Sequence, residues 1–166
     1  MNFTPTELKR LMLLAPRMTL AVAESLTAGH VQARVASVAG ASDFFLGGVT
    51  AYTLDGKVSL LGVNRAAAGL VNCVSSSVAE QMAIGAGAMF GSDFAVATTG
   101  YAEPAVEWAV TEPFAWWALA RKREEGKYAL RSGRVVCAGA SRVEAQKIVA
   151  ETALAELVGW LREVRG

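Results

Sequence analysis

One stretch decides the fold class, and it reads TLAVAESLTAG at residues 19–29. Its first half, residues 19–23, is a short run of strand-forming and small apolar residues, and its second half, up to Gly29, is small and polar. From residue 31 to residue 38 the apolar side chains recur at helical spacing. A buried strand that ends in a small, polar turn and leads into a helix is the repeating unit of α/β domains. The stretch therefore predicts a strand–turn–helix unit.

The rest of the chain continues this alternation. Expected helices cover residues 6–14, 31–38, 57–61, 76–90 and 141–164, and expected strands cover residues 19–23, 44–52, 94–98, 114–120 and 134–138. The last two strands are expected to form a hairpin around Gly126. Gly47 and Gly48 are expected to mark a bulge or a close backbone approach. Strands separated by helices, followed by two adjacent strands, predict a three-layer α/β/α sandwich with a mixed β-sheet.

Length and composition favour one globular domain spanning residues 1–166. Apolar residues make up 53% of the chain and charged residues 19%, which is enough to build a core without disulfide bonds. The net charge of +1 comes from interspersed signs, so no nucleic-acid partner is expected. The one dense basic patch, residues 121–123, is followed at once by Glu124 and Glu125. It is interpreted as a solvated strand end or turn rather than a phosphate site.

No membrane partner is expected either. No uncharged apolar run approaches the roughly 20 residues that a membrane helix needs. Residues 1–10 carry Glu7, Lys9 and Arg10 where a signal peptide would need its apolar stretch. We therefore expect a cytoplasmic protein.

The residue inventory excludes several kinds of chemistry. His30 is the only histidine, and it follows Ser25 by five residues on one predicted helix, a spacing at which the two side chains do not meet. Cys73 and Cys137 are far apart and are expected to be buried free thiols rather than a disulfide or a nucleophile. No phosphate-binding glycine motif is present. A histidine triad and a zinc site are excluded, and neither a metal nor another cofactor is expected.

Polar clusters follow three of the expected strands: residues 24–27, Tyr52 and residues 98–100. In open α/β sheets, ligands bind outside the carboxyl ends of the strands, so these clusters are expected to converge on one crevice. Ser25 is expected at a helix amino terminus, where free N–H groups favour an anion. The alternatives are that Ser25 is a plain helix cap, that Tyr52 is a core aromatic, and that Thr98 and Thr99 are ordinary strand-end residues.

Several segments resemble the CinA carboxy-terminal domain family. Residues 23–29, AESLTAG, are similar to its AESxTxG opening, and residues 40–52, GASDFFLGGVTAY, to its GASDxFLGGxxAY segment. Residues 57–63 are similar to its KVxxLGV, residues 97–100 resemble its strand-end TG, and Arg142 stands where the family has an arginine at the start of its last helix. The resemblance runs from about Leu8 to Leu157. It implies hydrolysis of the amide of nicotinamide mononucleotide by a serine–lysine mechanism.

The resemblance also implies a role for each matching residue. Ser25 would be the nucleophile and neutral Lys57 its base, while Tyr52 would relay the proton or orient Lys57. Thr99 and backbone N–H groups near Ser25 would stabilise the oxyanion, and Arg142 would meet the substrate phosphate or orient the site. The expected substrate-binding set is Glu24, Thr27, Gly29, Thr98, Gly100 and Arg142. The alternatives are a surface lysine at position 57 and an unrelated surface charge at position 142.

The chain departs from the family pattern mainly in one loop. The family usually continues after its TG as IAGPGGG, whereas residues 101–108 read YAEPAVEW, and Glu103 and Glu107 would repel a phosphate if they face the site. Leu26 and Ala28 replace a usual Cys and Gly, and Gln146 stands where a second arginine is common. The departures favour two alternatives: an impaired relative that binds a nucleotide or a protein partner, and an amidohydrolase with a different small amide substrate.

A final expectation concerns assembly. Residues 114–117, Phe-Ala-Trp-Trp, together with the nearby Trp108, carry more large aromatic surface than one buried sheet face requires. Aromatic residues of this kind are enriched at the centres of interfaces, so we expect a homo-oligomer that uses this region. The alternative is a strand that is buried on both faces.

Overall fold

The computed structural model describes residues 3–166, which form a five-stranded sheet of order β2-β1-β3-β4-β5. The strands are β1 (Leu20–Glu24), β2 (Phe45–Thr50), β3 (Phe94–Tyr101), β4 (Phe114–Lys122) and β5 (Tyr128–Val136). β1 pairs in parallel with β2 and β3, whereas β4 is antiparallel to both β3 and β5. The carboxyl ends of the three parallel strands therefore lie at the same edge of the sheet.

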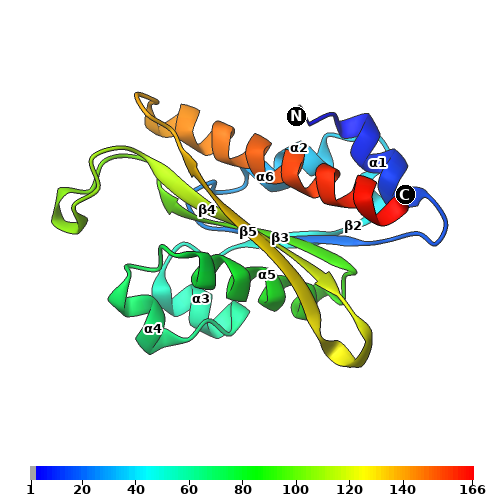
Figure 1. Cartoon of the computed structure of the whole chain (residues 1–166), viewed down its shortest axis with the longest axis horizontal. Coiled ribbons are helices and arrows are strands. Elements are labelled where there is room, and N and C mark those ends of the chain that lie inside the picture. The colour runs from blue at the N-terminus through cyan, green and yellow to red at the C-terminus, as the bar shows by residue number, and fades with distance from the viewer. Residues whose placement is uncertain (1–2) are drawn as a thin grey trace.

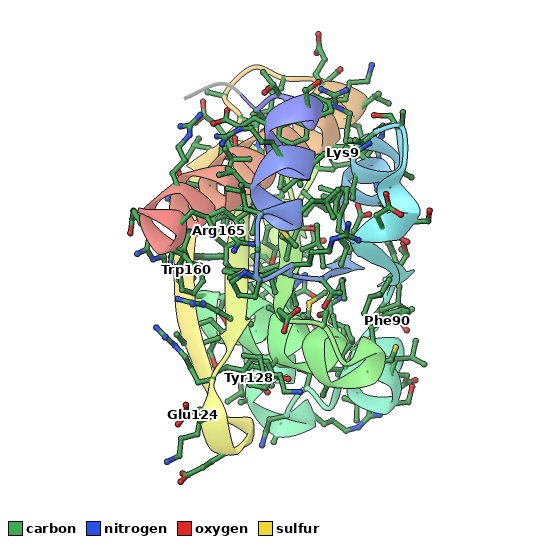
Figure 2. All side chains as sticks on the ribbon, turned by 90° about the vertical axis from the view of Figure 1, so that its right-hand side faces the viewer. Lys9, Phe90, Glu124, Tyr128, Trp160 and Arg165 are labelled. Atoms are coloured by element: carbon green, nitrogen blue, oxygen red, sulfur yellow. The ribbon has the colours of Figure 1, made fainter. Side chains whose placement is uncertain are left out.

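Helices cover both faces of this sheet (Figure 1). On one face lie α1 (Pro5–Leu13), α2 (His30–Ala36) and α6 (Arg142–Arg165), and on the other lie α3 (Leu54–Leu61), α4 (Arg65–Leu70) and α5 (Ser76–Phe90). Figure 2 shows Trp160 and Arg165 of α6 on one side of the sheet, with Phe90 of α5 and Tyr128 on the other. The predicted three-layer α/β/α sandwich with a mixed sheet is confirmed.

The two layers between helices and sheet are packed differently. Beneath α6 the core is built from large side chains such as Leu154, Leu157 and Phe94. Beneath α5 it is built mostly from alanines, and Gly85 of α5 lies so close to α3 that an added Cβ would approach the Leu61 carbonyl oxygen to 2.2 Å. Small residues let α5 and α3 pack tightly, and this packing places α3 beside the carboxyl ends of the parallel strands.

Two expectations about individual strands are confirmed. The first six residues of β3 are all buried, the pattern expected of a central strand covered on both faces. The register between β1 and β2 shifts at the start of β2, which is a bulge. Gly47 sits at this shift with φ of 141°, and a Cβ there would lie 2.7 Å from the Phe90 ring. Both a bulge and a close approach therefore explain the glycine.

Other boundaries differ from those expected. The strand expected over residues 134–138 is β5, which begins at Tyr128, because the turn after β4 closes over Glu124–Gly126 and pairing resumes at once. α3 begins three residues earlier than expected because the Thr53 hydroxyl accepts a hydrogen bond from the Gly56 N–H. Helix α4 was not predicted.

The aromatic residues of β4 lie on both faces of the sheet. Trp117 packs against the core beneath α6, and Trp116 packs against the core beneath α5. The strand therefore contributes to both layers, which agrees with the alternative of a strand that is buried on both faces. Trp108, in the short helix η2 (Val106–Trp108), remains 43% exposed. It belongs to an arm between β3 and β4 that projects to the left in Figure 1.

Candidate active site

A cavity of about 490 Å³ opens at the carboxyl ends of the parallel strands. This is the edge at which open α/β sheets bind ligands, and the volume is in the range of small-molecule sites. It is lined by residues of β3, α3, the start of α6 and the β3–β4 arm, and by the segments that follow β1, β2 and α4. Ser25, Tyr52, Lys57, Thr99, Gly100 and Arg142 are among the lining residues. The structure thus brings together all four residues expected to be catalytic.

Lys57 lies against Ser25 at the bottom of this cavity. The lysine is only 2% exposed, and its Nζ lies 2.9 Å from the Ser25 Oγ. The same nitrogen donates to the backbone carbonyl oxygens of Ala51 at 2.9 Å and Tyr52 at 3.2 Å. Lys57 is therefore not a surface lysine. The chain segment that follows β2 supplies two carbonyls that hold its amine beside the serine.

The surroundings of Lys57 favour its neutral form. Burial lowers the pKa of the Lys57 amine below its usual range, and the nearby Cys73 thiol offsets part of that shift. A neutral amine has two N–H donors and one lone pair. If the two carbonyls take both donors, the lone pair is left for the third neighbour, the Ser25 hydroxyl. In this arrangement Ser25 donates its hydrogen bond to Lys57, as activation of a nucleophile by a base requires.

Glu24 has a different position from the one expected. It is fully buried, and its carboxylate accepts hydrogen bonds from the backbone N–H groups of Gly29 at 3.0 Å, Val31 at 3.0 Å and Gln32 at 2.8 Å. These donors belong to the first turn of α2, whose positive end favours a carboxylate. Glu24 therefore anchors α2 to the end of β1. Neither Glu24 nor Gly29 is among the residues that line the cavity.

Ser25 stands in the turn between β1 and α2 and not at the start of a helix. α2 begins at His30, so the expectation that Ser25 occupies a helix amino terminus is wrong, and so is the alternative that it is a helix cap. The cause is the Glu24 carboxylate, which takes the helical N–H groups that a capping serine would take. The Ser25 N–H instead donates to the Thr98 carbonyl oxygen at 3.0 Å, which continues the pairing of β1 with β3.

The turn leaves backbone donors free beside Ser25. Within residues 3–166, the N–H groups of Leu26 and Thr27 have no protein acceptor. An N–H group directly after a nucleophilic serine is a common oxyanion donor in other hydrolases. The Thr27 hydroxyl is 2.7 Å from the Thr98 hydroxyl, and both side chains are fully buried. This contact ties the turn to β3 without reaching the cavity.

Thr99 is buried, and its hydroxyl is already used. It donates to the Cys73 carbonyl oxygen at 2.6 Å, so its proton points away from an oxyanion. Cys73 itself is a half-buried free thiol that lines the cavity, whereas Cys137 is buried. Thr99 thereby fixes the segment after α4 against β3. Sequence reasoning missed Cys73 and its neighbour Asn72 as lining residues, because α4 was not predicted.

Tyr52 and Arg142 meet at the mouth of the cavity. The Tyr52 side chain is 52% exposed, so it is not a core aromatic, and its hydroxyl accepts a hydrogen bond from Arg142 Nη2 at 2.7 Å. Tyr52 contacts Lys57 through its backbone carbonyl and not through its hydroxyl. Arg142 Nη1 also forms an ion pair of 2.5 Å with Glu103 of the arm. Gln146, one turn further along α6, does not line the cavity.

Two absences hold for residues 3–166, the part of the chain that the structure describes. No group of three or more His, Cys, Asp or Glu side chains in this part of the chain is arranged to hold a metal ion. None of its helices combines the length and the apolar character that crossing a bilayer requires.

Fold and site together define an α/β domain with a buried serine–lysine pair at the carboxyl ends of its parallel strands. The model of the CinA C-terminal domain family matches residues 5–161, so the chain belongs to this family. A CinA-like protein of Chlorobium limicola is 37% identical over 157 residues, which are 93% of this chain and 36% of that protein. A CinA-like protein of Picosynechococcus is 51% identical over 86 residues, which are 52% of this chain and 20% of that protein.

Solved structures of the same superfamily share the fold. Competence damage-inducible protein A of Klebsiella pneumoniae superposes with a TM-score of 0.84 at 26% identity, covering 95% of this chain and 94% of that one. A competence/damage inducible protein of Agrobacterium tumefaciens gives a TM-score of 0.75 at 27% identity, covering 98% of each chain. By contrast, this chain spans only about a third or less of the length of the curated relatives described above.

Proposed function

We propose that this site hydrolyses a small carboxamide by a serine–lysine mechanism, with nicotinamide mononucleotide as the substrate that the family resemblance implies. The products would be nicotinate mononucleotide and ammonia. The observation that carries the proposal is the 2.9 Å contact between the buried Lys57 amine and the Ser25 hydroxyl. A buried lysine without a carboxylate partner is costly to maintain, and a lowered pKa at a cavity is typical of a functional group.

The reaction follows from the contacts of the pair. Lys57 takes the hydroxyl proton of Ser25 as the oxygen attacks the carboxamide carbon. The N–H group of Leu26, a residue that lines the cavity, stabilises the negative oxygen of the tetrahedral intermediate. Lys57 then returns the proton to the departing nitrogen, and ammonia leaves. A water molecule, deprotonated by Lys57, attacks the acyl-serine ester, releases the carboxylate product and restores Ser25.

The experiment is ammonia release from nicotinamide mononucleotide and from related carboxamides, compared among three variants. Ser25→Ala and Lys57→Met should each lower the rate about a thousandfold, since they remove the nucleophile and the base. Methionine has a similar length and suits a buried position, so Lys57→Met should stay folded. Lys147→Met removes an exposed lysine of α6 outside the cavity and should leave the rate unchanged. Wild-type turnover that survives Lys57→Met would refute the mechanism.

The contact between Glu103 and Arg142 favours one alternative, an amidohydrolase with a different small amide substrate. In that case ammonia is released from an amide other than the nucleotide, and the same two substitutions abolish the release. A catalytically impaired relative would bind a nucleotide or a protein partner and release no ammonia from any amide. The panel of amides therefore separates all three functions.

A further inference from the structure

Arg142 is the only guanidinium among the described residues that line the cavity, and its two terminal nitrogens are already engaged. Nη1 pairs with the Glu103 carboxylate at 2.5 Å, and Nη2 donates to the Tyr52 hydroxyl at 2.7 Å. Arginine grips phosphates and carboxylates through the forked geometry of these donors. A carboxylate of the chain itself therefore occupies the position at which Arg142 would hold an anionic group of a substrate.

The charge of the whole cavity points the same way. Among the described lining residues, those with charged side chains are Lys57, Glu103, Glu107 and Arg142. The proposed mechanism needs Lys57 neutral, because an ammonium cannot accept the serine proton. Two carboxylates and one guanidinium then remain charged among these lining residues, so the competent cavity carries a net negative charge. Such a cavity attracts a cation and repels a phosphate dianion.

We propose that Glu103 is a specificity-determining residue that selects a carboxamide substrate without a phosphate group, either neutral or cationic, such as a pyridinium carboxamide nucleoside. This inference rests on the proposed serine–lysine hydrolysis, and it replaces nicotinamide mononucleotide, the substrate that the family resemblance implies, by a carboxamide without a phosphate. Glu103 acts in two ways. It holds Arg142 in an ion pair within the chain, and it adds a negative charge at the cavity mouth, where a phosphate would have to displace it.

The first test compares nicotinamide mononucleotide with the same molecule lacking its phosphate. The wild-type protein should give the higher kcat/KM for the nucleoside. Glu103→Gln should raise kcat/KM for the nucleotide about tenfold, mainly through a lower KM, while the value for the nucleoside stays the same or falls. Glu112→Gln makes the same change of charge on an exposed residue just before β4 that does not line the cavity, so it should not alter the ratio.

The second test measures binding without turnover. Ser25→Ala, titrated with each compound by calorimetry, should bind the nucleoside more tightly than the nucleotide, and adding Glu103→Gln should reverse or remove that preference. Tighter binding of the nucleotide to Ser25→Ala, or binding of neither compound, overturns the role of Glu103. If the binding preference holds but the wild type releases no ammonia, the hydrolysis proposal fails while the selection by Glu103 stands.

Discussion

Replacing Glu24 by glutamine tests how the turn that carries Ser25 is held. The carboxylate accepts hydrogen bonds from three backbone N–H groups at the start of α2, and it is fully buried. A glutamine offers one oxygen, so at least one N–H would face an amide NH₂ group instead of an acceptor. Losing one charge-assisted bond costs about 1.5–3 kcal/mol, and the favourable charge at the helix terminus is lost as well.

Glutamine is also cheaper to bury than a carboxylate, which offsets part of this loss. We therefore expect Glu24→Gln to lower the free energy of unfolding by about 2–4 kcal/mol, or the melting temperature by about 5–15 °C. Urea denaturation followed by circular dichroism measures the change. Ammonia release should also fall at temperatures at which the variant is still folded, because the Ser25 turn loses its anchor.

Glu144→Gln is the matched control for this substitution. Glu144 is a capping carboxylate as well, but it lies on the surface at the start of α6 and accepts only from the Ser141 N–H. Its replacement should have a much smaller effect on stability. If Glu24→Gln is no more destabilising than Glu144→Gln, the buried carboxylate does not anchor α2 and our reading of the turn is wrong.

Three further predictions concern proton binding, strain and assembly. The pKa of Lys57 is lower in the folded protein, so between that pKa and the usual lysine value of about 10.4 the unfolded chain binds more protons than the folded one. The free energy of unfolding should therefore rise with pH across this window in the wild type and not in Lys57→Met. Over the same window, kcat/KM should rise as Lys57 loses its proton. Ala28 has a φ of 46°, a conformation that strains a residue with a side chain, so Ala28→Gly should raise the free energy of unfolding by about 0.5–1 kcal/mol in denaturant titrations. An unchanged or lower free energy of unfolding would show that Ala28 is not strained. We still predict a homo-oligomer, now through Val106 and Trp108, which are 87% and 43% exposed. In sedimentation, the double variant with Val106→Ser and Trp108→Ser should be a monomer. A wild-type protein that is monomeric at micromolar concentration would refute this prediction.

The sequence was sufficient to predict the part of the site that depends on topology. Parallel strands end at one edge of a sheet, so polar residues after β1, β2 and β3 had to converge once the strands were recognised. Small, β-branched and polar residues mark those strand ends clearly, which is why Ser25, Tyr52 and Thr99 could be placed together. The contact of Lys57 with Ser25 was accessible only through the family resemblance, because a lone lysine has no pattern of its own.

Other features depend on side-chain reach, which spacing does not encode. The Glu24 side chain extends from the end of β1 to the first turn of α2. Its local sequence does not distinguish a carboxylate that binds the start of a helix from one that contacts a substrate. β5 is an edge strand on which Arg131 and Leu130 are both exposed, so the alternation expected of a half-buried strand is missing. The Ala-rich α4 is short and lacks an apolar stripe, and without it Asn72 and Cys73 could not be assigned to the cavity.

The Ser25–Lys57 contact and the Glu103–Arg142 ion pair are held by different parts of the molecule. Ser25 and Lys57 are fixed by backbone groups of β3 and of the segment after β2, which the core holds in place. Glu103 belongs to an exposed arm, and its ion pair with Arg142 lies at the surface, where such pairs contribute little to stability. A change in the arm can therefore alter which molecule enters the cavity at almost no cost to the fold or to the Ser–Lys geometry. Under the proposed function, the Ser25–Lys57 pair that would break the amide bond can therefore stay unchanged while Glu103 alters the substrate preference.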